Sequence, residues 1–101
     1  MAKQKSPLTV GVIGTGAIAR EQHLPYWREL EAEGRVHIAG LCDVVRERRE
    51  AEAAQCRDAK TYADMRKMLS ENRFDIIDVC TQNRFHSVAT VAGLQAGANV
   101  L

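Results

Sequence analysis

A glycine-rich turn between an apolar run and a helical pattern constrains this chain more than any other feature. Residues 8–13 are apolar and rich in β-branched side chains, which favours a strand, and the residues after the turn favour a helix. In the turn, Gly14 permits a sharp change of direction, and Gly16, which has no Cβ, lets a ligand approach the backbone. Ala19 is small enough for the helix to pack closely on a sheet. The pattern Gly-x-Gly-x-x-Ala in this setting predicts a pyrophosphate site; the alternative is a turn that only connects two elements.

The start of the helix and a later carboxylate extend this pattern toward a dinucleotide site. The free amides of Ala17 and Ile18 are expected to point at the phosphates, where the helix dipole favours an anion. Asp43 closes the next apolar run, where a carboxylate accepts hydrogen bonds from the adenosine ribose; alternatively it caps the helix that begins near Val45, and the two roles are compatible. A carboxylate repels a 2′-phosphate, which favours NAD, although Arg46 offers a partner for the 2′-phosphate of NADP.

Short apolar runs alternate with helical patterns along the whole chain. The pattern predicts strands at residues 8–13, 36–42, 60–62 and 76–80, a fifth beginning at 100, and helices at residues 17–33, 46–55, 65–71 and 85–96. Strands separated by helices imply right-handed crossovers and a parallel sheet. The predicted fold class is therefore α/β, a doubly wound parallel sheet of the Rossmann type with strand order 3-2-1-4-5, incomplete because a sixth strand would normally follow.

Local signals set the expected helix boundaries. Pro25 is expected to kink or restart the first helix, and Gly34 and Gly97 are expected to end helices. Asp64 is a natural N-cap for the helix at 65–71. In the last helix, one apolar face is expected to pack on the sheet, formed by Val88, Val91, Ala92 and Gln95.

A second polar segment follows the fourth predicted strand. The carboxyl end of this strand lies beside the first strand, where a dinucleotide crosses a doubly wound sheet. Thr81 and Asn83 are therefore expected near the nicotinamide half of a cofactor. His86 lies within reach of the same crevice; the alternative is a histidine that only caps or packs its helix.

Several spaced motifs together resemble the Gfo/Idh/MocA oxidoreductases. The resemblance rests on Gly11–Ala19 followed by His23-Leu24-Pro25, on Tyr62-x-Asp64, on Asp75–Cys80 with Thr81-x-Asn83-x-x-His86, and on Leu94–Leu101. It implies hydride transfer between NAD(P) and a sugar, inositol or related polyol, by a protein with an N-terminal Rossmann domain and a C-terminal α/β domain. The cofactor contacts that it implies are Gly14, Gly16, Ala17, Ile18, Asp43, Thr81, Asn83 and His86.

Two departures from the family pattern limit what the resemblance implies. Gln82 stands where the family usually has proline, and the chain ends at Leu101, before the Glu-Lys-Pro motif that carries the usual catalytic lysine. We therefore expect residues 1–101 to be an incomplete N-terminal dinucleotide-binding domain without the C-terminal substrate domain, inactive alone and with no catalytic residue of its own. The alternative is a non-catalytic dinucleotide-binding module, a sensor or a scaffold.

Composition narrows the range of partners. Fourteen basic residues nearly balance thirteen acidic ones, so nucleic acid is not an expected partner, and no apolar run is long enough to predict a membrane helix. The three cysteines form no C-x-x-C pair and no zinc-ligand spacing, so no metal is expected, and a reducing cytoplasm is the predicted location. The resemblance adds a homo-oligomer as the expected state of the full-length protein.

Overall fold

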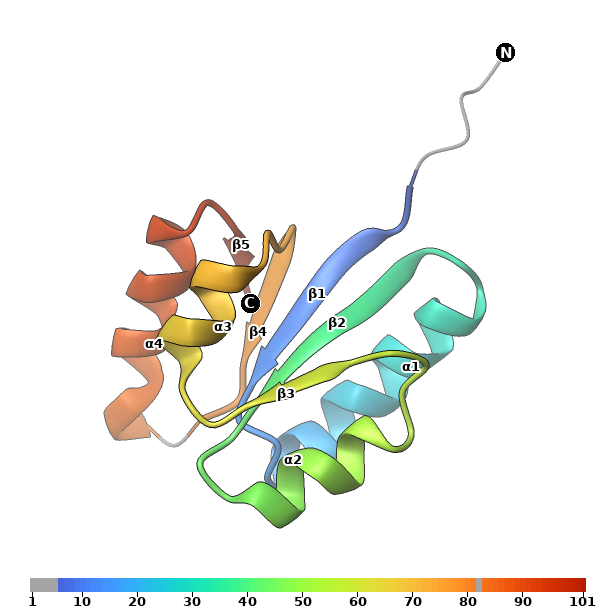
Figure 1. Cartoon of the computed structure of the whole chain (residues 1–101), viewed down its shortest axis with the longest axis horizontal. Helices are drawn as coiled ribbons and strands as arrows, with labels where there is room; N and C mark the ends of the chain where they lie inside the picture. The colour runs from blue at the N-terminus through green and yellow to red at the C-terminus, as the bar shows by residue number, and fades with distance from the viewer. Residues whose placement is uncertain (1–5, 82) are drawn as a thin grey trace.

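Five parallel strands and the helices that connect them form the chain, in a computed structural model that describes residues 6–81 and 83–101 (Figure 1). The strands are β1 (Leu8–Ile13), β2 (Val36–Cys42), β3 (Lys60–Tyr62), β4 (Ile76–Val79) and β5 (Asn99–Val100). The helices are the π-helical η1 (Ala19–His23), α1 (Leu24–Ala32), α2 (Arg46–Ala53), α3 (Met65–Glu71) and α4 (Asn83–Gln95). Among the described residues, no helix combines the length and the apolar character that crossing a membrane requires.

The strand order is β3-β2-β1-β4-β5, which confirms the predicted doubly wound sheet. β1 lies in the middle, and its last residue, Ile13, pairs with Cys42 of β2 and Val79 of β4. Because all the pairings are parallel, the carboxyl ends of these three strands meet at one edge of the sheet. From β1, the chain first adds strands on one side (β2, β3) and then on the other (β4, β5). Doubly wound folds bind ligands at the carboxyl ends of the strands where this change of direction occurs.

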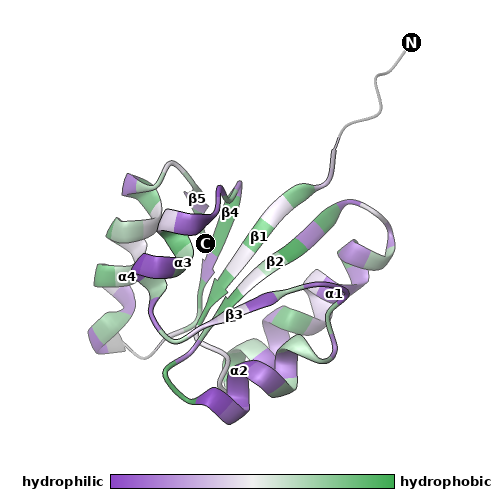
Figure 2. Cartoon of the chain, viewed as in Figure 1, coloured by the Kyte–Doolittle hydropathy of each residue, from purple (hydrophilic) through white to green (hydrophobic). Residues whose placement is uncertain are grey.

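Helices cover both faces of the sheet, as Figure 1 shows. α1 and α2 lie on one face, over a core that contains Val10, Val12 and Leu24. α3 and α4 lie on the other, over a core that contains Met68 and Ile77. The central strands are mostly apolar and α2 is mostly polar (Figure 2), as expected for a sheet whose faces are covered by helices. α4 differs, because several of its exposed side chains are apolar.

A π-helical turn, Ala19–His23, interrupts the first helix before α1. The Leu24 amide donates to the carbonyl of Ala19, five residues earlier, and Pro25 follows in the first turn of α1. Proline has no amide hydrogen, so it cannot donate to a carbonyl of the preceding turn. The expected kink or restart at Pro25 therefore takes the form of a change of helix type just before it, and this wider turn carries His23, whose ring contacts Asp78 of β4.

Helix α4 packs on the sheet through small residues, and the expected apolar face was wrong. Val88 and Val91 are about half exposed, whereas Ala89 is 1% exposed. A Cβ added to Gly93 would lie only 3.0 Å from Val100 Cγ2, so the helix lies too close to the strands for larger side chains. The helical period was predicted correctly, but close packing selects the small residues for the buried side.

The other helix boundaries follow the predicted signals. Asp64 caps α3, because its Oδ1 accepts a hydrogen bond of 2.9 Å from the Arg66 amide. Gly34 and Gly97 follow α1 and α4 with φ angles of +77° and +89°. Left-handed backbone at these positions is readily adopted only by glycine, so both residues end their helices as expected.

Candidate functional site

The turn after β1 is held between the ends of β2 and β4. The Gly14 amide donates to the Cys42 carbonyl at 2.7 Å, and the Cys80 amide donates to the Ile13 carbonyl at 2.7 Å. Gly14 has a φ of +99°, and an added Cβ would lie 2.8 Å from the carbonyl carbon of Cys80. Only glycine can take this conformation in this space, which is the role that the sequence predicted for Gly14.

Gly16 has a different role, because its missing side chain leaves open space. The nearest atom to an added Cβ is Nη1 of Arg48, 3.7 Å away. The Gly16 carbonyl accepts a hydrogen bond of 2.9 Å from the Arg20 amide and so begins the first helix. The first amides of a helix have no partner within the helix, so Ala17 and Ile18 offer donors beside this space. The turn therefore offers backbone donors and a guanidinium to an anion.

Asp43 joins the end of β2 to the glycine-rich turn. Its Oδ2 accepts hydrogen bonds from the amide of Thr15 at 2.8 Å and from Thr15 Oγ1 at 3.0 Å. Its Oδ1 accepts from the Val45 amide at 2.8 Å, just before α2. The carboxylate thus fixes the turn and the approach to α2. It does not cap this helix as the alternative expected, because the N-cap residue is Val45 and no side chain caps it. A carboxylate has about four lone-pair sites, so these bonds leave capacity for a ligand hydroxyl.

A cavity of about 1010 Å³ opens at this edge of the sheet. The predicted site residues that line it are Gly14, Gly16, Ala17, Ile18, Asp43 and Thr81. Its volume is at the upper end of the range of small-molecule and cofactor sites, about 300–1,000 Å³. Residues from both ends of the sequence therefore meet around one space large enough for a dinucleotide.

The structure does not bring the remaining predicted residues into the described lining. Arg46 pairs with Glu50, with 3.0 Å between Nε and Oε2, and its side chain is 73% exposed. His86 is exposed on α4 and is not among the described lining residues. Asn83 begins α4, but its side chain lies outside the described part of the chain, as does Gln82.

The residues after β4 bring a hydroxyl, of Thr81, and a thiol, of Cys80, to the cavity. Thr81 Oγ1 is buried and has no hydrogen-bond partner among the described residues. A buried hydroxyl without a partner is uncommon and is satisfied when a ligand supplies one. Cys80, in contrast, is a poor nucleophile: burial, the charge of Asp78 and a hydrogen bond to Asp78 raise the pKa of its thiol to about 12.

Sequence reasoning missed the arginines that lie at the cavity. Arg20 and Arg48 line it, and Arg49 Nη1 donates to the Asp43 carbonyl at 2.9 Å. Arg46, Arg48 and Arg49 are alike in the sequence, and only the direction in which α2 leaves β2 decides which of them faces the turn. The helix places Arg48 toward Gly16 and Arg46 toward Glu50.

Comparisons with known proteins agree with this architecture. A family model described as "Oxidoreductase family, NAD-binding Rossmann fold" matches residues 8–101. D-glucoside 3-dehydrogenase of Escherichia coli is 31% identical over 100 residues, which are 99% of this chain and 28% of that protein. D-apiose dehydrogenase of Paraburkholderia graminis is 31% identical over 86 residues, which are 85% of this chain and 22% of that protein.

A solved structure shows the same fold. The WlbA dehydrogenase from Bordetella pertussis, in complex with NADH and UDP-GlcNAcA, has a TM-score of 0.81 at 22% identity, over 93% of this chain and 28% of that one. The chain thus spans less than a third of the length of each of these three proteins. With the family model matched over nearly all of its residues, the chain belongs to the Gfo/Idh/MocA oxidoreductases and carries their NAD-binding Rossmann fold.

Proposed function

We propose that the cavity binds NAD(H) for hydride transfer in a dehydrogenase whose substrate is a sugar, inositol or a related polyol. The observation that carries the proposal is that the glycine-rich turn, Asp43 and Thr81 line one cavity. An extended dinucleotide needs an anion site in the middle and polar partners at its two ends. The open space at Gly16 and the unpartnered hydroxyl of Thr81 fit such a ligand.

The pyrophosphate is assigned to the turn at Gly14–Ile18. The amides at the start of the first helix and the guanidinium of Arg48 would share its charge. Arg20 lines the same cavity and adds a second cation. The turn itself is positioned by Asp43 through Thr15, so the groups that bind the phosphates are held before the ligand arrives.

The adenosine ribose is assigned to Asp43, which favours NAD over NADP. A ribose hydroxyl would donate to the remaining lone pairs of the carboxylate, whereas a 2′-phosphate would meet its negative charge. Arg46 is bound to Glu50, so accepting a 2′-phosphate there requires breaking that ion pair. Arg48 is the cation beside the turn, but it lies at Gly16 and serves the pyrophosphate.

The nicotinamide half is assigned to the end of β4. Thr81 Oγ1 would gain the partner that it lacks among the described residues, and Asn83 and His86 follow on α4. The bound nicotinamide supplies the hydride acceptor or donor; the protein holds it in place. The relatives named for D-glucoside and D-apiose support a sugar as the substrate of the whole protein.

The first test separates a ribose contact from a purely structural Asp43. NADH and NADPH are titrated by calorimetry into the wild type and into Asp43→Ala. Loss of a charged hydrogen bond to the ribose, worth about 1.5–3 kcal/mol, should weaken NADH binding roughly tenfold or more beyond any loss for NADPH. A loss of the same size for both cofactors would remove the ribose assignment.

Thr15→Val is the matched control for this test. It removes the hydroxyl that donates to Asp43 at 3.0 Å and leaves the carboxylate in place. The turn is loosened for both cofactors alike, so the ratio of the NADH and NADPH dissociation constants should stay that of the wild type. If Thr15→Val changed this ratio as much as Asp43→Ala does, the discrimination would come from the shape of the turn.

A further inference from the structure

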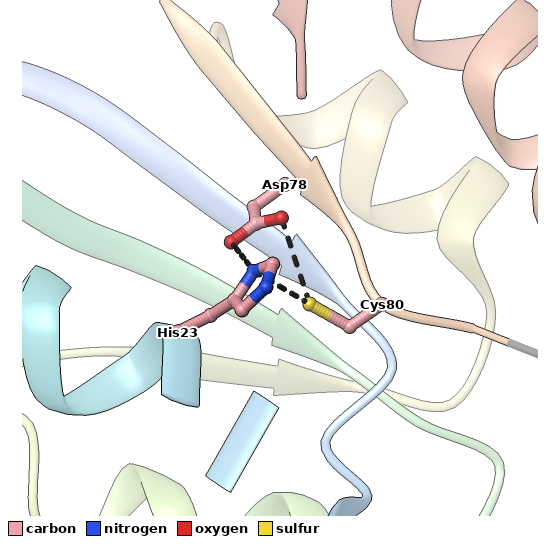
Figure 3. Close-up of side chains that lie close together, drawn as sticks. All are labelled: His23, Asp78 and Cys80. Carbon is pink, nitrogen blue, oxygen red and sulfur yellow. Dashed lines mark hydrogen bonds and ion pairs between the residues drawn. The ribbon is translucent and has the colours of Figure 1, made fainter. Parts of the chain in front are cut away.

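Three potential metal ligands from distant parts of the sequence converge between η1 and the end of β4 (Figure 3). His23 Nδ1 lies 2.7 Å from Asp78 Oδ2, and Cys80 Sγ lies 3.4 Å from the same nitrogen and 3.5 Å from Asp78 Oδ1. Asp78 and Cys80 point to the same face because they are two residues apart at the end of a strand. The π-helical turn places the ring of His23 against both.

These separations are close to those between ligands of a tetrahedral Zn²⁺ ion. With Zn–S near 2.3 Å and Zn–N or Zn–O near 2.0–2.1 Å, neighbouring N···S and O···S atoms are about 3.5 Å apart. The two distances to Cys80 Sγ agree with this value. Only one carboxylate oxygen joins a tetrahedral set. The 2.7 Å between His23 Nδ1 and Asp78 Oδ2 is a hydrogen-bond distance, and the imidazole nitrogen and the Oδ1 that faces Cys80 would settle about 3.3 Å apart around a metal. His23 can make this adjustment, because its side chain is 39% exposed while that of Asp78 is 2% exposed.

The charges balance when a divalent ion binds this cluster and the thiol proton is released. Without metal, His23 Nδ1–H donates to Asp78 Oδ2 and the Cys80 thiol donates to Asp78 Oδ1. On binding, the imidazole proton moves to Nε2 and the thiol proton leaves to solvent, since a coordinated thiol is deprotonated outright. A neutral imidazole, a carboxylate and a thiolate then compensate the two positive charges, which suits a largely buried site.

A second interaction already orients the carboxylate. Trp27 Nε1 donates to Asp78 Oδ2 at 2.8 Å, and Trp27 is 9% exposed. Donors of this kind, outside the ligand set, fix a ligating carboxylate and tune the metal. Since Trp27 is the only tryptophan of the chain, its fluorescence also reports on the cluster.

We propose that His23, Asp78 and Cys80 bind one divalent transition-metal ion of the Zn²⁺ class. The imidazole and thiolate favour Zn²⁺ over Mg²⁺ or Ca²⁺, which prefer oxygen ligands. Among the described residues, no other histidine, cysteine or carboxylate supplies a fourth ligand to this group, so the fourth coordination position is left to water. Cys80 also lines the dinucleotide cavity, whereas His23 and Asp78 are not among its described lining residues. The test is made without NAD, so its outcome does not depend on NAD binding.

The test titrates Zn²⁺ and Co²⁺ into the reduced 101-residue chain. Zn²⁺ should change the Trp27 emission with a stoichiometry of one ion per chain and release one proton. Co²⁺ should give a thiolate-to-cobalt charge-transfer band together with tetrahedral d–d absorption, and Zn²⁺ should displace it. Absence of the charge-transfer band in the wild type would overturn the proposal and leave a hydrogen-bond network that only closes α1 on the sheet.

Variants with matched controls locate the ion. Cys80→Ser should abolish the charge-transfer band, and His23→Gln should weaken Co²⁺ binding at least tenfold, in proteins whose circular dichroism matches the wild type. His37→Gln is the control for the histidine, because His37 Nδ1 lies 3.2 Å from Glu31 Oε2 with a similar exposure of 35% but without a thiol. Cys56→Ser is the control for the thiol. Both controls should bind Co²⁺ like the wild type, and a band that survives Cys80→Ser or disappears with Cys56→Ser would overturn the site.

Discussion

Gly14 and Gly16 are alike in the sequence, but the structure requires them for different reasons. Gly14 has a φ of +99° and backbone atoms within 2.9 Å of the place where a Cβ would stand. Gly16 has neither constraint, since only Arg48 Nη1 lies near its Cβ position, at 3.7 Å. The first glycine therefore serves the fold, and the second leaves room for the ligand that we propose.

Gly14→Ala should destabilise the chain. Left-handed backbone costs a non-glycine residue about 1–2 kcal/mol, and the crowding against the end of β4 adds about 1–3 kcal/mol. The free energy of unfolding, measured in urea, should therefore fall by about 2–5 kcal/mol. A variant as stable as the wild type would show that the turn has another accessible conformation.

Gly16→Ala should leave the stability nearly unchanged and weaken NADH binding. The added methyl meets no backbone atom within 4 Å, so the free energy of unfolding should change by less than about 1 kcal/mol. The same methyl occupies the space through which a pyrophosphate would approach the amides, so NADH affinity measured by calorimetry should fall at least tenfold. Undiminished NADH binding would place the phosphates elsewhere in the cavity.

At the scale of single residues, the sequence located the glycine-rich turn, but not all of its partners. Asp43 was predicted, whereas its partner Thr15 was not, because nothing in a Gly-x-Gly pattern marks the middle residue. Arg46 was singled out, but Arg48 lies at the turn. Which arginine faces a ligand depends on the rotation of a helix about its axis, and a run of mixed charges does not reveal that rotation.

At the scale of helices and strands, α3 shows how local sequence features stabilise an element. Helix α3 has only seven residues, too few to be stable by propensity alone. It depends on its Asp64 cap and on packing of Met68, which is fully buried in the core. The prediction of this helix succeeded because its capping carboxylate is a local signal.

Asp64→Ala should therefore remove a measurable part of the stability. Loss of an N-cap aspartate costs about 1 kcal/mol, which should appear as a lower urea midpoint with an unchanged slope. Asp64→Asn should restore most of it, because asparagine caps about as well. Asp58→Ala, at an exposed aspartate before β3, is the control and should have little effect; equal losses at both positions would indicate a general charge effect.

Elements whose arrangement depends on distant contacts were predicted less well. The strands and helices were predicted to within two residues of their observed bounds, with the correct strand order. The phase of α4 was wrong, since the close approach of Gly93 to Val100 selects small residues for its buried side. The convergence of His23 with Asp78 and Cys80 was not foreseen either, because they come from different ends of the chain and show no ligand spacing.

At the scale of the whole molecule, the thiol of Cys42 shows that burial in the fold disfavours a charged group. Cys42, at the end of β2, is 4% exposed. Burial and the carboxylates of Asp43 and Asp64 raise the pKa of its thiol from the ordinary 9.0 to about 11, although Arg49 acts in the opposite direction. The unfolded chain has no such environment, so the difference in pKa makes stability depend on pH.

The sign of this dependence follows from which state holds the proton. Between pH 9 and pH 11 the unfolded thiol has ionised and the folded thiol of Cys42 has not, so the unfolded state binds fewer protons. The free energy of unfolding should then fall as the pH rises, by up to about 1.4 kcal/mol per pH unit, and level off above the folded-state pKa. Below pH 9 both states keep the proton, and the term vanishes.

Comparison of the wild type with Cys42→Ala isolates this contribution. The variant loses packing at every pH, but it has no thiol at this position to ionise, while lysines and tyrosines titrate in both proteins. Its deficit in the free energy of unfolding should therefore be constant below pH 9 and shrink steadily between pH 9 and pH 11, as measured by urea unfolding across this interval. Parallel pH profiles would mean that the folded chain does not hold the Cys42 proton more tightly than the unfolded one, and that the end of β2 is open to water.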